Sequence, residues 1–428
     1  MGDDRTRQGR RNEGRVPSVR LSRTDMVTGT TAEAERRSVR RALMRPSTPA
    51  APVREADIAA IVARALHDPV GGSPQLPLGV DAAALIAAAS RHRVLLLLGW
   101  TLRAAGTLEE WPAEFITAFQ QAEREAVIVD CIRHAELVAA LAAFSAAGVR
   151  VVVFKGAALA HTHYPAPHVR VRADTDLLVV ASEVRALEDV LGRLGYVRPA
   201  ETSGRLVSYQ SHYHKIDRHG VTHAFDVHWR ISNLQLLADR LTFQELWEHR
   251  IPLAALGSSA VTIDDVHALL LALVHLAGHH PGSRNLLWIH DLHALASRLT
   301  PEEMRQVQEI AGARGLGPLA ADGLALARNW FGQAVDPIID ALRARGPRQD
   351  DAMVLEGPRT QARVLRLDLD ALPDWRARGR LIREHLLPST RYMRARYGVR
   401  SNLLLPGFYI WRVLVGTPKW FRSNKPEH

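Results

Sequence analysis

The chain has 428 residues, of which 47% are hydrophobic, and it carries a formal net charge of +10. This length is enough for a large buried core, and we expect two packed units plus tails. The positive charge lies at the ends: residues 1–54 carry +7 and residues 351–428 carry +8, which leaves −5 for the residues between them. An acidic centre with basic ends excludes the basic groove of a general DNA-binding or RNA-binding protein.

The single cysteine, Cys131, excludes an internal disulfide and a cysteine-rich zinc site, and we expect it to be packed within a helix. No apolar run reaches the roughly eighteen residues of a transmembrane helix, so the sequence predicts no transmembrane span. Residues 1–54 are rich in arginine and lack the apolar segment of a secretory signal. We interpret them as the disordered basic tail of a cytoplasmic protein.

The next region, residues 55–148, is predicted to be an N-terminal helical cap. Apolar residues recur at spacings of three and four within 55–66, 81–106 and 112–148, so each of these ranges is predicted to be a helix. Gly148 is expected to end the last helix, because glycine readily adopts the left-handed conformation that stops helices. An α/β core is expected to follow over residues 149–230.

The core opens with VVVFKGAALA, residues 151–160, which predicts a strand, a tight turn and a helix. Glycine at 156 lets the backbone pass close to a bulky anion, and the first amides of the following helix have no intrahelical partner. Lys155 adds a positive charge at the mouth of this turn. The Lys155-Gly156 turn is therefore a candidate phosphate-binding site.

Two acids, Asp174 and Asp176, precede the apolar run from Leu177 to Val180. If this run is a strand, the alternation of side chains points both carboxylates to the same side. Like charges this close destabilise each other unless a cation lies between them, and Mg²⁺ prefers oxygen ligands. The pair therefore predicts a magnesium site.

A third acid, Asp226, lies in an alternating segment, HAFDVHW. Alternation separates Phe225 and Val227 from Asp226 and His228, so we expect the first pair in the core and Asp226 in the site. Residues 206–217 and 221–229 are predicted to be two strands joined by a hairpin loop that contains Gly220.

Further elements complete a predicted α+β fold, in which a small mixed sheet with flanking helices is embedded between N-terminal and C-terminal helical regions. Ser182 is expected to cap a helix over 183–194, and Tyr196 and Val197 are expected to begin a short strand. The C-terminal helical domain, residues 231–346, is predicted to contain an apolar helix capped by Asp264 or Asp265 and ending at Gly278. Three more helices are predicted over 286–299, 301–313 and 319–345, the last with a break near Pro337.

Residues 347–428 form a basic C-terminal extension. Residues 375–387 predict a basic helix, and the apolar, aromatic run 408–415 follows. We expect this run to pack onto the helical domain, and peripheral contact with a membrane surface is the alternative.

The core carries a resemblance to a known family. Lys155-Gly156, an Ala/Leu helix, Tyr164-Pro165 and Arg170 are followed by Asp174-x-Asp176-Leu177-Leu178-Val179 and then by Asp226-x-His228-Trp229. This order resembles a nucleotidyltransferase family with the pattern KG-x-AL, Y, R, D-x-DLLV and D-x-HW, which is placed in the polymerase-beta-like nucleotidyltransferase superfamily. Classical members of the superfamily have Gly-Ser at the phosphate turn, where this chain has Lys155-Gly156.

The resemblance implies a site and a reaction. Asp174, Asp176 and Asp226 would be the catalytic residues and the ligands of two Mg²⁺ ions, and Gly156 would approach the phosphates of a nucleoside triphosphate. Lys155, Arg170 and Arg172 are further candidates for nucleotide binding, because their charges neutralise phosphate oxygens. The reaction would transfer a nucleoside monophosphate to an unknown hydroxyl-bearing acceptor, a small molecule or a peptide, with release of pyrophosphate.

Two alternatives remain from the sequence. The chain could bind nucleotide without turnover, as a pseudo-enzyme or scaffold in a biosynthetic pathway. The cluster of His275, His279, His280, His290-Asp291 and His293 is instead compatible with a metal-dependent phosphohydrolase of the His-Asp type. His275 falls on an apolar helix, however, where a hydrogen-bonded core histidine is the usual occupant.

Overall fold

The computed structural model describes residues 55–71, 80–199, 206–279, 284–332, 336–344, 360–399 and 401–420. All of them belong to one compact unit, residues 52–428. The predicted basic tail, residues 1–54, lies outside the described residues, as do His280 and the start of the predicted C-terminal extension. The finer division of the chain into a cap, a core and a helical domain stays a prediction.

The N-terminal region is helical, as predicted, but the helix expected over 81–106 is two helices. The elements are α2 (Glu55–His67), α3 (Ala82–Arg91), α4 (Leu95–Ala105) and α5 (Ala113–Ala146). The polar triplet Arg91-His92-Arg93 marks the break, where Arg93 has a left-handed φ of 60°. The prediction was wrong because the bend lets Leu85 and Leu98 both reach the core, where both are 0% exposed. Cys131 of α5 is exposed, contrary to the expectation that it is packed.

None of the described helices is both long enough and apolar enough to cross a membrane by itself. The pair α3 and α4 passes on length and composition when taken together, although it is bent by 115°.

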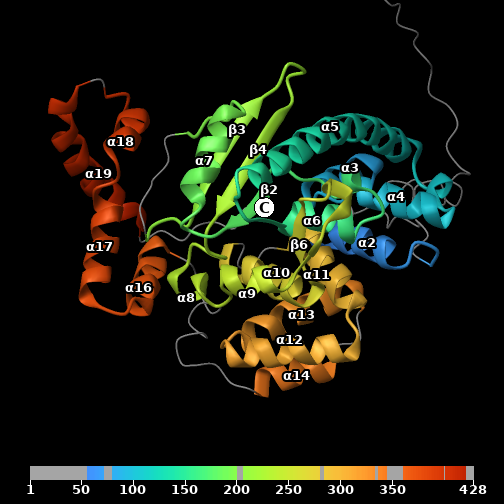
Figure 1. The fold of residues 1–428 in the computed structure, drawn as a ribbon. Helices are drawn as coiled ribbons and strands as arrows, with labels where there is room; N and C mark the ends of the chain where they lie inside the picture. The colour runs from blue at the N-terminus through green and yellow to red at the C-terminus, as the bar shows by residue number, and fades with distance from the viewer. Residues whose placement is uncertain are drawn as a thin grey trace, which may run out of the picture. The chain divides into compact units, whose positions relative to one another are not determined.

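A four-stranded mixed sheet holds the centre of the fold, as predicted (Figure 1). Its order is β1-β2-β4-β3, with β1 (Val151–Phe154), β2 (Thr175–Val179), β3 (Gln210–Ile216) and β4 (Thr222–His228). Strand β2 runs antiparallel to β1 and parallel to β4, and β3 pairs antiparallel with β4. The parallel pairing aligns Asp176 with Asp226, two residues that are far apart in the sequence.

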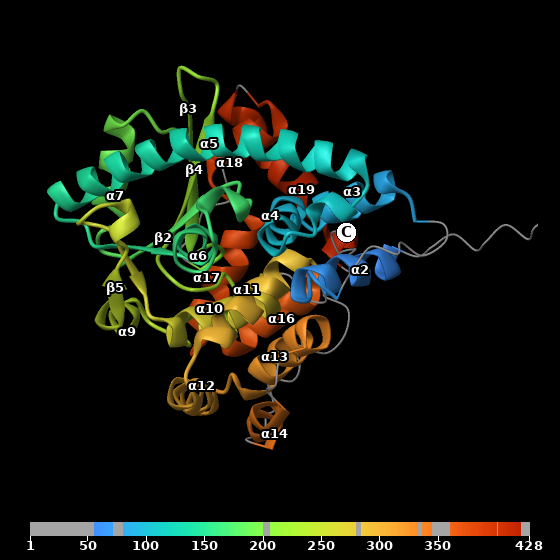
Figure 2. The same cartoon turned by 90° about the vertical axis from the view of Figure 1, so that its right-hand side faces the viewer.

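Each face of the sheet is covered by helices, with α5 on one side and α10 and α11 on the other (Figure 2). Phe144 of α5 and Leu187 of α7 (Val184–Arg193) pack with Val153 and Leu177 on one face. The other face, which includes Val152 and Leu178, joins the larger core of the N-terminal and C-terminal helices. The helix α6 (Lys155–Thr162) follows β1 directly, as the Lys155-Gly156 turn predicted.

Two local predictions in the core were wrong. Helix α7 begins at Val184 after Glu183, and no side chain caps it, because Ser182 lies in an exposed turn. Glu183 instead accepts a hydrogen bond from the backbone N–H of Arg150 at 2.7 Å. The strand expected over 206–217 begins only at Gln210, and Val197 forms a single bridge with His214 rather than a strand.

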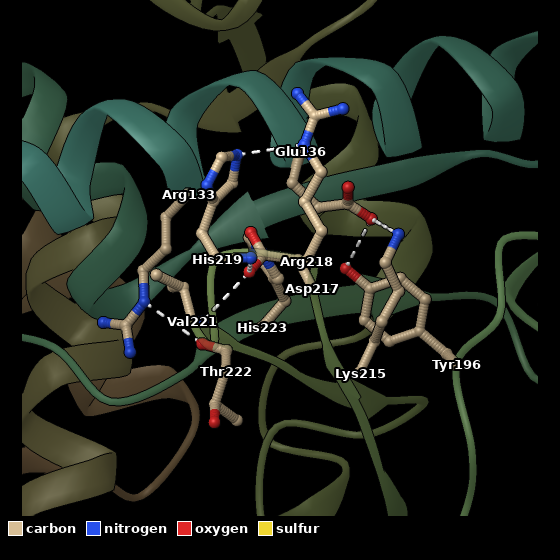
Figure 3. A network of polar contacts seen from close by, with 10 residues as sticks. All are labelled: Arg133, Glu136, Tyr196, Lys215, Asp217, Arg218, His219, Val221, Thr222 and His223. Carbon is tan, nitrogen blue, oxygen red and sulfur yellow. Dashed lines mark hydrogen bonds and ion pairs between the residues drawn. The ribbon is translucent and has the colours of Figure 1, made fainter.

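The β3–β4 hairpin is held against α5 by polar contacts (Figure 3). Glu136 of α5 accepts hydrogen bonds from Lys215 Nζ at 2.5 Å and from Tyr196 Oη at 3.1 Å. At the turn, Asp217 accepts a bond from the backbone N–H of Val221 at 2.9 Å, and Arg133 donates one to the carbonyl of Thr222 at 3.3 Å. These contacts fix β4, the strand that carries Asp226.

Helices form where the sequence predicted them between residues 265 and 345, whereas the elements between residues 235 and 263 were not predicted. A short segment comprises α8 (Gln235–Ala238), α9 (Phe243–Glu248), β5 (Arg250–Pro252) and β6 (Val261–Ile263). It leads to α10 (Asp265–His279), α11 (Leu286–Arg298), α12 (Pro301–Ala313), α13 (Gly317–Phe331) and α14 (Asp336–Ala344). Asp264 caps α10 by accepting a bond from the backbone N–H of His267 at 2.9 Å, and the break between α13 and α14 confirms the one predicted near Pro337.

The chain ends in a further helical segment, drawn in orange to red in Figure 1. It consists of α16 (Gln361–Ala371), α17 (Trp375–Leu386), α18 (Thr390–Tyr397) and α19 (Leu405–Trp420). The predicted basic helix corresponds to α17, and the apolar run 408–415 lies in α19. Asp368 of α16 joins this segment to α8, because its carboxylate accepts a hydrogen bond from the backbone N–H of Gln235 at 2.8 Å.

Candidate functional site

The sheet brings two of the predicted acids together. Asp176 of β2 and Asp226 of β4 are aligned in register, and their carboxylates and the ring of His228 offer donor atoms within 4.8 Å of one another. His228 Nε2 lies 2.8 Å from Asp176 Oδ1, and His212 Nδ1 of β3 lies 2.6 Å from Asp226 Oδ1. These residue types match the oxygen and imidazole ligands of divalent cations. The D-x-H alternation of β4 was the sequence signal for His228.

Asp174 lies in the turn just before β2 and lines the same cavity as Asp176 and Asp226. Burial raises the pKa of its carboxyl group, and the neighbouring charges of Asp176 and Asp226 raise it further. Asp174 is outside the tight group that Asp176 forms with Asp226 and His228. The three predicted acids therefore share one electrostatic environment, with Asp174 at its edge.

Lys155 supplies positive charge to this cluster. Its Nζ donates to Asp176 Oδ1 at 2.8 Å and lies 3.5 Å from His228 Nε2. Burial opposes ionisation of Asp176, but Lys155 and the hydrogen bond from His228 outweigh it and hold the pKa of that carboxyl far below its usual range. Lys155 has a left-handed φ of 51°, a conformation that costs energy for a residue other than glycine. The strained backbone of Lys155 therefore coincides with the placement of its ammonium group beside the carboxylates.

Gly156 is required by a close contact on the other side of the turn. A Cβ atom at this position would lie 2.2 Å from Nη1 of Arg170, closer than any real contact. Glycine was predicted to allow a phosphate to approach. The structure shows that a guanidinium group already uses part of this space.

Arg170 is locked in a buried ion pair. Its Nε donates to Asp291 Oδ1 at 2.9 Å and its Nη2 to Oδ2 at 2.5 Å, while Tyr164 Oη donates to the same Oδ1 at 2.7 Å. Arg170 and Asp291 are only 6% and 5% exposed. Burial disfavours the charge on Arg170, but Asp291 outweighs it and keeps the pKa of Arg170 raised. The structure therefore gives Arg170 a partner that the sequence interpretation did not anticipate.

Arg172 is also engaged. Its Nη2 forms an ion pair with Asp130 of α5 at 2.5 Å, and its Nη1 donates to the carbonyl of Pro167 at 3.1 Å. The side chain is 7% exposed, although the residue lines the cavity. The roles predicted for Arg170 and Arg172 in nucleotide binding stay predictions.

Arg93, at the break between α3 and α4, is a cationic residue of this cavity that sequence reasoning missed. It forms no ion pair within the described ranges, and its Nη2 donates to the carbonyl of Val171 at 3.4 Å. Burial and the nearby Arg170 lower the pKa of its guanidinium, whereas Asp174 raises it. The polar triplet at 91–93, between two apolar helices, was the signal that could have identified it.

The cavity in front of these residues has a volume of about 1350 Å³. A single small ligand occupies a pocket of about 300–1,000 Å³, so this cavity has room for a nucleotide and a second molecule. Apolar residues from several helices form much of its wall, and they include Ala59, Leu271, Leu276, Trp288 and Trp330.

The histidine cluster that suggested a phosphohydrolase does not form a metal-binding group within the described residues. Asp291 is already bonded to Arg170 and Tyr164. Burial lowers the pKa of His290 to about 4, which keeps the ring neutral at neutral pH. The other group with metal-ligand geometry among the residues described is His249, Asp264 and His267, at the start of α10.

Comparison with known proteins found a match to a protein family. A family model described as an uncharacterised nucleotidyltransferase matches residues 79–332, which span α3 to α13 and include the acids, Lys155 and Arg93. A search of curated proteins gave no match. Since the family model covers more than half of the 428 residues, the chain belongs to the uncharacterised nucleotidyltransferase family.

Proposed function

We propose that the protein is a magnesium-dependent nucleotidyltransferase that moves a nucleoside monophosphate from a nucleoside triphosphate to a hydroxyl-bearing acceptor. The observation that carries this proposal is the meeting of Asp176 and Asp226 on parallel strands, with Asp174 beside them, at the wall of a large cavity. Three acids face the ammonium group of Lys155 and, without an ion pair, the guanidinium of Arg93, which leaves a surplus of negative charge. A divalent cation removes that surplus.

The side chains fit magnesium. Asp174, Asp176 and Asp226 offer carboxylate oxygens, and His228 is bonded to Asp176 in the way that neighbouring groups orient metal ligands. We assign one ion to all three acids and a second ion to Asp174 and Asp176. Bound there, Mg²⁺ would neutralise phosphate charge and lower the pKa of the acceptor hydroxyl.

Lys155 and Arg93 are assigned to the phosphates. Lys155 and Asp176 both line the cavity, and the flexible side chain of Lys155 can transfer its contact from the carboxylate to a phosphate oxygen. Arg93 approaches from the helical cap and has no carboxylate partner among the residues described. Together they would place two positive charges at the cavity wall near the acids.

In the proposed reaction the acceptor oxygen forms a bond to the α-phosphorus, and the bond from that phosphorus to the bridging oxygen breaks. The products are the nucleotidylated acceptor and pyrophosphate, and the hydroxyl proton is released. Positioning and charge neutralisation account for most of the catalysis in such transfers. The apolar wall that includes Trp288 and Trp330 is available to the acceptor.

The test is incubation with each α-labelled nucleoside triphosphate, Mg²⁺ and a cell extract, followed by measurement of pyrophosphate and of where the label goes. We expect transfer by the native protein and none by Asp176→Asn. Asp189→Asn, on the exposed side of α7, is the matched control and should retain full activity. Equal transfer by the native protein and Asp176→Asn would contradict the proposal.

A second candidate is nucleotide binding without turnover. The ion pair between Lys155 and Asp176 favours it, because the ammonium group already neutralises one of the acids. Binding of nucleotide with no pyrophosphate release, whatever acceptor is supplied, would support this candidate over the first.

A further inference from the structure

Large hydrophobic side chains are exposed mainly in the C-terminal helices. Of the fifteen that are exposed within the described ranges, nine lie between residues 375 and 414. They are Trp375, Ile382, Leu387, Leu403, Leu404, Ile410, Trp411, Val413 and Leu414. Single exposed apolar residues are ordinary, but a concentration of this kind marks an interaction surface.

Helix α19 shows that this surface is distinct from the core of its own segment. One side of the helix, with Leu405 and Phe408, packs with Met393 and Val399. Ile410 is 62% exposed and Leu414 is 66% exposed. Residues four apart lie on the same face of a helix. The outer face of α19 is therefore apolar, although only the inner face packs against the rest of the segment.

The same segment is strongly basic. The described residues from 360 to 414 include ten arginines against four acids. The arginines of α17 and α18 are exposed: Arg376, Arg378, Arg380, Arg383, Arg391, Arg394 and Arg396. Apolar and aromatic side chains among arginines are the composition of an amphipathic segment that lies in the interface of an anionic membrane.

We infer that α17–α19 dock onto an anionic lipid surface, with Ile410, Trp411 and Leu414 inserted and the arginines at the headgroups. A second copy of the chain fits this face poorly, because a symmetric contact would oppose two strongly positive surfaces. A nucleic acid would use the arginines and could accept one or two apolar wedges between its bases, but it would leave most of the nine exposed apolar side chains in water. This inference is independent of the proposed function.

Vesicle flotation of the full chain tests the inference. We expect binding to vesicles of phosphatidylcholine with about 30% phosphatidylglycerol, little binding to phosphatidylcholine alone, and loss of binding as salt rises from about 0.1 M to about 0.5 M. Absence of binding to the anionic vesicles, or equal binding to both, would overturn it.

A pair of matched variants separates this face from general hydrophobicity. Ile410→Ser should weaken vesicle binding about tenfold or more, whereas Ile128→Ser on α5 should leave it unchanged. Both isoleucines are 62% exposed in the native protein, so their removal changes total exposed apolar surface similarly. Equal loss in the two variants would contradict the assignment.

A third experiment tests the contribution of the arginines and distinguishes a lipid surface from RNA or a second copy of the chain. Replacing Arg376, Arg380 and Arg383 by glutamine should reduce binding to anionic vesicles by about fivefold for each arginine. Binding of a short RNA through these arginines, without vesicle binding, would overturn the inference in favour of nucleic acid. Self-association lost in Ile410→Ser, again without vesicle binding, would overturn it in favour of a second copy.

Discussion

The Lys155-Gly156 turn contacts two groups of charged side chains that differ in their net charge. Lys155 reaches the cluster of Asp174, Asp176 and Asp226, where negative charge exceeds positive charge. On the other side, Gly156 packs against the guanidinium of Arg170, which forms a buried ion pair with Asp291.

This difference separates a functional group of charges from a structural one. The Arg170 and Asp291 pair has fixed partners and little exposure, and we propose a structural role for it. The acids face a cavity, and burial together with the charges of Asp176 and Asp226 disfavours the ionised form of Asp174 unless a ligand compensates it. We therefore assign catalysis to the first group and support of the turn to the second.

The largest expected effect comes from breaking the acidic group. Asp226→Asn should lower the rate of nucleotidyl transfer by at least about 10³-fold, because it removes a charge that the transition state requires. Thermal unfolding should show a folded protein that is no less stable, since one like charge is gone. A variant with more than about a tenth of the native rate would remove Asp226 from the site.

Breaking the structural pair should change stability. Asp291→Ala leaves Arg170 buried without its partner and should lower the free energy of unfolding by about 3–5 kcal/mol, as measured by urea denaturation. Asp322→Ala, which removes the partner of Arg343 at an exposed ion pair, should cost about 0–1 kcal/mol. Equal losses in the two variants would show that the Arg170 pair does not support the fold.

Arg93 is the cavity arginine that we propose as part of the functional group. Arg93→Ala should raise the KM for the nucleoside triphosphate by about 10- to 100-fold with little change in unfolding. Arg103→Ala, which breaks a pair with Glu123 on the same helical cap, should leave KM unchanged. An unchanged KM in Arg93→Ala would indicate that Arg170 or Arg172 binds the phosphates instead.

Asp368 adds a third kind of buried carboxylate, one that forms no ion pair within the described ranges. Burial raises its pKa from 3.8 to about 6. The folded state thus favours the protonated form of Asp368. The stability that protonated Asp368 contributes is fully present below about pH 3.8 and is lost as the pH rises through about 6.

Asp368→Asn keeps the acceptor for the backbone N–H of Gln235 and removes the charge. The substitution should raise the free energy of unfolding by about 1–3 kcal/mol at pH 8 and change it little below about pH 3.8, as measured by urea denaturation at both pH values. A difference between variant and native protein that does not change with pH would contradict this assignment.

Local patterns were sufficient to predict the centre of the fold. The strands β1, β2 and β4 follow from apolar runs and alternation, whereas the parallel pairing that brings Asp176 to Asp226 was not predicted. The helix after Lys155 follows from its alanines. These features depend on neighbours within a few residues, which is the range over which sequence patterns carry information.

The partners of the arginines could not be predicted in this way. Arg170 and Asp291 are 121 positions apart and meet only because α11 packs beside the core. The position of Arg93 depends on a sharp bend that neither glycine nor proline marks. Long-range packing determines both the partner of Arg170 and the position of Arg93. The sequence therefore indicated arginines near a phosphate site but did not show which of them is available to bind phosphate.

Anomalous diffraction from crystals grown with Mn²⁺ and a non-hydrolysable nucleoside triphosphate would show whether a metal ion binds at the acids. We predict a metal peak between Asp176 and Asp226, with Lys155 displaced toward the phosphates. A peak at His249, Asp264 and His267 with none at the acids, or nucleotide bound away from the acids, would contradict the assignment of this site.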